Sequence, residues 1–217
     1  MINAGITKMS TFQMPKTNKL AEDRRLEQGA WLFIMSLSVF FFSCTILYAI
    51  YVMLRIAPEA GQMQPFYLPR MFLLTTVNML AISVLLHMAV EAVRRERQTD
   101  FVRYIVLAFI LSLVFFVVQG SALSWMVGEL MKPNALISNL YGLTFFLVII
   151  HALHVVGGVA GLTFLLFGIS RRSYDHERNF PVRFCALYWH FLDLVWLLML
   201  ASFALAAFVS KQPAGLG

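Results

Sequence analysis

The sequence has little charge for its length. Only 13% of its 217 residues are charged, whereas 60% are apolar and 20 are phenylalanine. A soluble domain averages about 25% charged residues, so this composition excludes an ordinary soluble protein. It predicts an integral membrane protein, with little chain left over for a soluble domain.

Cysteine is almost absent as well. Cys44 and Cys185 are the only two, and they lie far apart in the sequence. Neither belongs to a spacing that is typical of a metal site or a disulfide framework. We interpret both as small apolar side chains within apolar segments.

The beginning of the chain lacks the apolar core that a secretory signal requires. We therefore interpret residues 1–28 as a polar cytoplasmic tail, not as a cleaved leader. The net charge of +6 is also spread over several segments. No soluble basic face is formed that would predict nucleic-acid binding.

Five apolar runs are long enough to cross a membrane, which takes about 20 residues at about 1.5 Å per residue. They predict an all-α integral membrane protein with five transmembrane helices. The expected membrane domain is 29–210, followed by a short outer C-terminal tail, 211–217. The runs lie near 29–54, 68–93, 101–128, 137–169 and 184–210.

Lysine and arginine are distributed unevenly between the two ends of these spans. If the N-terminus is cytoplasmic, thirteen of the 17 basic residues fall in the N-terminal tail and in the second and fourth loops. Only Arg55, Arg70, Lys132 and Lys211 then lie outside. The positive-inside rule thus predicts a cytoplasmic N-terminus and an outer C-terminus.

Ionisable residues inside the spans need a reason, because a central aspartate costs about 2.5–3.5 kcal/mol on insertion scales. The fifth span contains His190 and Asp193, and the fourth contains His151 and His154. The spacing of three within each pair places both members on one helix face. His87 lies in the second span.

Three interpretations compete for these residues. A haem held by two histidines requires equal depth. At about 1.5 Å per residue, His154 lies about 22 Å from the cytoplasmic helix end, His190 about 10 Å and His87 about 9 Å. Only His87 with His190 fits a shared iron. A proton path needs several buried acids, and only Asp193 is well inside.

The third interpretation is structural, and it is the one we favour. Gly157 and Gly161 form a G-x-x-x-G spacing, which allows a second helix to approach closely. Trp189 and Trp196 share a helix face with Asp193, so an indole N–H is expected to donate to the buried carboxylate.

The segment YWHFLDLVW, Tyr188–Trp196, resembles the last-helix signature of subunit III of the haem-copper terminal oxidases. The fourth span is similar to the preceding helix of that family in its Thr144-Phe145-Phe146 and His151-x-x-His154-Val-x-x-Gly158 elements. GAWLFIMS in the first span resembles the family's Gly-x-x-Leu-Phe-Ile-x-Ser, and Gln119 falls where the family has a glutamine. The length is similar to that of the short bacterial form with five helices.

The resemblance implies two helix groups with a lipid-holding cleft between them, and no redox centre or active site in this chain. It implies attachment to catalytic subunit I, which holds haem and copper, and to other oxidase subunits in a bacterial cytoplasmic membrane. Bound phospholipid is expected. The residues expected to make structural, lipid or partner contacts are His151, His154, Gly157, Gly158, Gly161, Tyr188, Trp189, His190, Asp193 and Trp196.

Two positions depart from the family pattern, since Leu37 and Ala122 stand where the family typically has glutamate. The resemblance therefore does not extend to a proton-related role of those carboxylates. The alternatives are a similar accessory subunit of a nitric oxide reductase, a b-type cytochrome membrane anchor and a small transporter. A b-type cytochrome would be red when purified alone, whereas the accessory subunit would be colourless.

Overall fold

The computed structural model describes residues 16–59, 65–131, 135–170 and 180–211, and in these ranges it contains helices and no strand. The long helices are α1 (Lys16–Tyr51), α2 (Met71–Arg94), α3 (Gln98–Leu130), α4 (Ala135–Ser170) and α5 (Phe180–Val209). All five are long and apolar enough to cross a membrane. The predicted all-α fold with five spans is confirmed.

The helix ends lie within a few residues of the predicted spans, except at the start of α1. That helix begins at Lys16, so part of the predicted polar tail is helical. Pro181 lies in the first turn of α5, where a missing N–H costs nothing. A π-helical turn, η1 (Val52–Ile56), and a 3-10 turn, η2 (Ala57–Glu59), complete the far end of α1.

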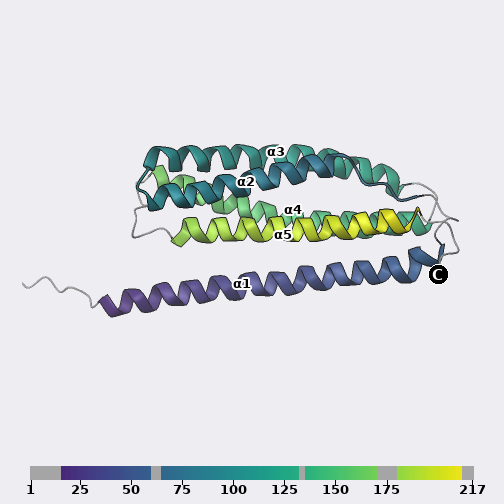
Figure 1. Cartoon of the computed structure of the whole chain (residues 1–217), viewed down its shortest axis with the longest axis horizontal. Coiled ribbons are helices and arrows are strands. Elements are labelled where there is room, and N and C mark those ends of the chain that lie inside the picture. Colours follow the sequence, from purple (N-terminus) through teal and green to yellow (C-terminus); the bar gives the residue numbers. More distant parts are fainter. Residues whose placement is uncertain (1–15, 60–64, 132–134, 171–179, 212–217) are drawn as a thin grey trace, which may run out of the picture.

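Four of the helices form a closed ring, in which α2 contacts α3, α3 contacts α4, α4 contacts α5 and α5 contacts α2. Helix α1 lies along the outside of this ring and contacts α5 (Figure 1). Neighbours in the chain run in opposite directions, so the beginnings of α1, α3 and α5 share one end of the molecule with the ends of α2 and α4 (Figure 1). Among the described residues, that end carries Arg24, Arg25, Arg94, Arg95, Arg97, Arg103 and Arg183, which were predicted to be cytoplasmic. The direction of insertion stays a prediction.

Hydroxyl groups within the helices are satisfied locally. Several serine and threonine side chains donate to the carbonyl four residues earlier, as lipid offers them no partner. These residues include Ser38, Thr45, Thr75, Thr76, Thr144 and Thr163. Among the described residues, the other buried polar groups within the spans include His151, Asp193, Gln119 and Asn78, and the Asn78 amide donates to the Leu111 carbonyl of α3 at 3.0 Å.

Candidate functional site

The glycines of α4 form the seam against which α5 packs. A Cβ atom on Gly158 would lie 3.0 Å from the Trp189 ring, and one on Gly157 would lie 3.2 Å from the Tyr188 hydroxyl. Gly161 faces the Cys185 sulfur, at 3.5 Å from an added Cβ. The close helix approach expected from the glycine spacing is present, because only hydrogen occupies this surface of α4.

The aromatic side chains of α5 are hydrogen-bonded across the seam. The Tyr188 hydroxyl donates to the His154 carbonyl at 3.0 Å, and the Trp189 indole N–H donates to the Gly158 carbonyl at 3.3 Å. The prediction that an indole serves the Asp193 carboxylate is therefore wrong for Trp189. Close contact with bare glycine backbone gives the indole a nearer acceptor.

Trp196 also bonds elsewhere, so that prediction fails for both tryptophans. Its indole N–H donates to the Thr76 hydroxyl of α2 at 2.9 Å. The ring is 1% exposed and packs edge-on against Phe72. Trp196 thus links α5 to α2, because its side chain extends across the interface between these two helices.

His151 and His154 both pack against α1, but their polar atoms differ. The His154 Nδ1–H donates to the Ile150 carbonyl at 2.8 Å, and its ring lies edge-on to Phe41 at 4.9 Å between centroids. His151 is fully buried between Phe41 and Trp196. Neither of its ring nitrogens has a hydrogen-bond partner among the described residues.

A second group of polar residues lies on the other side of α5, facing α2. We call it the α2–α5 groove; it has a volume of about 420 Å³. Its polar members are Ser83, His87, His190 and Asp193, and its apolar rim is formed by Leu80, Val84, Leu194 and Leu197.

Within the groove, His190 and Asp193 do not hydrogen-bond to each other. The Ser83 hydroxyl lies 2.6 Å from Nδ1 of His190 and is also within hydrogen-bonding reach of the Asp193 carboxyl. Asp193 is 7% exposed, and its Oδ1 has no partner in the part of the chain that the structure describes. Both side chains instead line the interface between α5 and α2, as their shared helix face allows.

The His87 and His190 rings lie side by side at 6.4 Å between centroids, as expected from their equal depth. Among the described residues, no group of three or more histidine, cysteine, aspartate or glutamate side chains is arranged to hold a metal ion.

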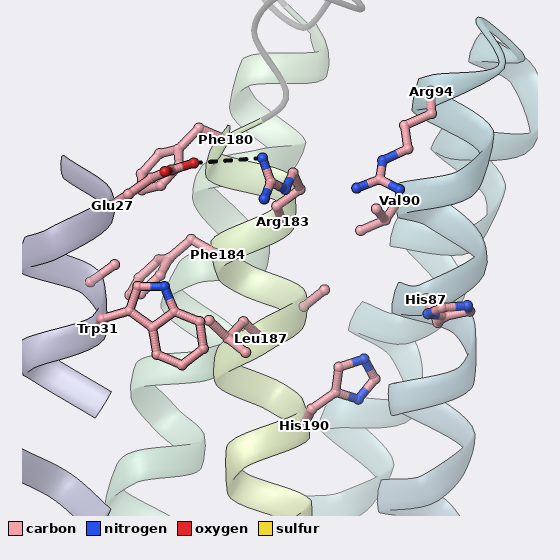
Figure 2. A pocket seen from close by; sticks show the side chains of 12 residues that line it. Glu27, Trp31, His87, Val90, Arg94, Phe180, Arg183, Phe184, Leu187 and His190 are labelled. Carbon is pink, nitrogen blue, oxygen red and sulfur yellow. Dashed lines mark ion pairs between the residues drawn. The ribbon is translucent and has the colours of Figure 1, made fainter. Parts of the chain in front are cut away.

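A pocket of about 350 Å³ opens beside the histidines, between α1, α2 and α5. Figure 2 shows Arg94 and Arg183 at one end of it, and His87 and His190 at the other. Arg183 pairs with Glu27 at 3.7 Å, whereas Arg94 has no ion pair among the described residues. Apolar walls come from Trp31, Val90, Phe180, Phe184 and Leu187.

The sequence did not point to this pocket. Arg94 and Arg183 were recognised only as part of the basic loops, since their proximity depends on the packing of α2 beside α5. One signal was available: each arginine lies at the same end of a span whose interior contains a histidine.

The positions that depart from the expected glutamates are accommodated by apolar packing. Ala122 is fully buried, and Leu37 is partly buried against the core. Gln119 is 2% exposed, and neither its amide oxygen nor its nitrogen has a partner within the described ranges.

Comparison with known proteins identifies matches over nearly the whole chain. Residues 4–206 match the family model described as cytochrome c oxidase subunit III. A cytochrome c oxidase subunit 3 from Heterololigo bleekeri is 30% identical over 207 residues, covering 89% of this chain and 74% of the relative. Those from Gadus morhua and Pongo abelii are 29% and 28% identical, each covering 91% of this chain and 75% of the relative.

Proposed function

Because this chain belongs to the cytochrome c oxidase subunit III family and is an accessory subunit of a haem-copper oxidase, we propose that it holds a phospholipid in the pocket between α1, α2 and α5. It does so within a complex whose catalytic subunit contains the haem and copper. The chain is a multi-pass membrane protein, and we place it in a bacterial cytoplasmic membrane.

The lipid proposal rests on one observation, which is that the pocket has two arginines at one end and apolar side chains along its walls. Arg94 and Arg183 occupy one end of the pocket, where a phosphate group would lie near the membrane surface. Arginine suits this role because its planar guanidinium binds phosphate through two parallel hydrogen bonds. The pocket walls below the arginines are apolar, so the acyl chains of a phospholipid would pack against them.

The charge balance favours an added anion. Arg94 has no ion pair among the described residues, and Arg183 has a partly exposed one with Glu27. An exposed ion pair contributes only about 0.2–1 kcal/mol, so a phosphate can compete for Arg183. The pocket volume of about 350 Å³ falls in the range of about 300–1,000 Å³ that is typical of ligand sites.

The lipid proposal is tested on the intact complex by changing Arg94 and Arg183 together to glutamine. We expect the purified double variant to lose one tightly bound phospholipid per complex, measured by phosphorus assay and mass spectrometry of extracted lipid. Arg103→Gln is the matched control, since Arg103 is also an exposed, ion-paired arginine at the same end. Unchanged lipid content in the double variant would contradict the proposal.

Association with the catalytic subunit is tested by affinity purification of the tagged chain from native membranes. We expect haem, copper and the catalytic subunit to co-purify with it. The same strain allows a test of orientation, because a cysteine added beside Arg95 should resist a membrane-impermeant reagent from the outside. Efficient outside labelling would reverse the predicted topology.

A further inference from the structure

We propose that the α2–α5 groove is the docking surface for a transmembrane helix of another oxidase subunit, which presents a hydrogen-bonding side chain to the exposed imidazoles of His87 and His190. This inference rests on the proposed function, since it requires the chain to be assembled in a complex. It assigns the docking to one surface and states the chemistry of the partner.

The groove continues the lipid pocket toward the centre of the membrane, and the two share His87 and His190. Asp193 lies about 20 Å along α5, a helix about 45 Å long at about 1.5 Å per residue. This position is near the centre of the hydrocarbon layer, which is about 30 Å thick. Headgroups and bulk water do not lie at that depth, so the groove faces either acyl chains or protein.

The exposed polar groups of the groove are the imidazoles of His87 and His190. Nδ1 of His190 shares one hydrogen bond with the Ser83 hydroxyl, and the imidazole tautomer decides which of the two donates. The Oδ1 atom of Asp193 is enclosed by this chain and has no partner among the described residues, so the two imidazoles are the groups that a neighbouring molecule can reach. An acyl chain offers no hydrogen bond, whereas a serine, threonine, asparagine, glutamine or arginine side chain on a facing helix does.

The outward surface of α3 shows what a lipid-facing helix of this chain looks like. At a similar depth it exposes only apolar side chains in its central turns, namely Ile110, Leu113, Val114 and Val117. The groove combines an equally apolar rim with four polar side chains. Polar residues at membrane depth usually face protein or an aqueous cavity, and here they line a groove open on one side.

The test is photo-crosslinking in the intact complex. A benzophenone amino acid replaces Leu194 or Val84, whose side chains are 67% and 58% exposed and lie on the groove rim. The matched control replaces Val117 of α3, which is 76% exposed. We expect both rim positions to crosslink to a membrane-spanning segment of a co-purifying oxidase subunit, and Val117 to form no protein adduct.

The other outcomes are distinguishable. If the oxidase co-purifies but the rim positions crosslink only to lipid, to a second copy of this chain or to nothing, the docking surface is wrong and the proposed function stands. If the tagged chain brings down no oxidase subunit, the proposed function fails, and this inference fails with it. A variant with His190→Leu should also lose the Leu194 adduct while keeping the isolated chain resistant to protease.

Discussion

Helix α5 presents two polar faces that differ in where their hydrogen-bond partners come from. On the face toward α4, the Tyr188 and Trp189 donors reach carbonyl groups of the same chain. On the face toward the α2–α5 groove, Asp193 retains an oxygen with no partner among the described residues. The chain completes the first face by itself and leaves the second open.

The difference follows from the residues opposite each face. Gly157 and Gly158 bring the α4 backbone close enough to accept hydrogen bonds. Opposite His190 and Asp193, α2 offers the short hydroxyl of Ser83 and the ring of His87, between bulky apolar side chains. We infer that the first face holds the subunit together and that the second serves assembly.

Replacing Gly158 by leucine should have the largest effect, because it disrupts the close packing of α5 against α4. Even a Cβ atom would lie 3.0 Å from the buried Trp189 ring, so the helices must separate. Overpacking of this kind costs about 1–3 kcal/mol or more. We expect the isolated chain in detergent to lose its protease resistance.

Gly120→Leu on α3 is the control, since no atom lies within 4 Å of a Cβ added there. It should leave the protease resistance unchanged. If Gly158→Leu were as well folded as the control, the seam would not depend on close approach.

The side of α5 that lines the α2–α5 groove is tested next, by His190→Leu, Asp193→Leu and the double variant. Each single change should weaken assembly by about 1–2 kcal/mol, or about 5–30-fold, because it leaves the other polar group without a shared network. The double change should be milder than the sum of the two. The measurement is the yield of intact complex at equal expression.

Strict additivity would contradict the idea that the two residues act as one unit. It would favour a separate role for Asp193, such as proton handling. Unlike Gly158→Leu, none of the three variants should reduce the protease resistance of the isolated chain.

The sequence predicted the fold well because the hydrophobic length of a span is a local property. It placed α2 to α5 within a few residues of their ends, and the glycine spacing indicated the seam. It missed the helical start of α1, since the polar residues after Lys16 carry no apolar signal although they continue the helix.

The site was predicted only in part, because hydrogen-bond partners depend on tertiary packing. Trp196 shares a helix face with Asp193, yet its indole reaches Thr76 across the helix boundary. Ser83 and Arg94 gain their positions only when α2 packs beside α5. Helical periodicity identifies which residues share a face but not which residue of another helix meets them.

Trp196→Phe should have a smaller effect, because it keeps the packed ring and removes only the hydrogen bond to Thr76. Bonds between membrane helices contribute about 0.6 kcal/mol on average and about 1.7 at most. We expect a modest decrease in the thermal midpoint of the isolated chain in detergent. Trp31→Phe is the control, since Trp31 is 57% exposed, and a larger decrease there would contradict the assignment.

His151→Leu should have the smallest effect, although His151 is the most deeply buried histidine of the set. Its ring nitrogens have no partner among the described residues, so the folded state already bears the cost of their desolvation. An apolar side chain of similar size removes that cost while keeping contact with Phe41 and Trp196. We expect an unchanged or slightly higher thermal midpoint, whereas His154→Leu loses a hydrogen bond to Ile150.

The His151, His154 double change to leucine should also leave the iron and copper content of the isolated chain at its original value. A marked decrease in stability for His151→Leu alone, or a loss of bound metal in the double variant, would show that the ring nitrogens bind a partner group in the folded protein. His151 would then resemble the residues of the α2–α5 groove, and not the hydrogen-bonded residues between α4 and α5.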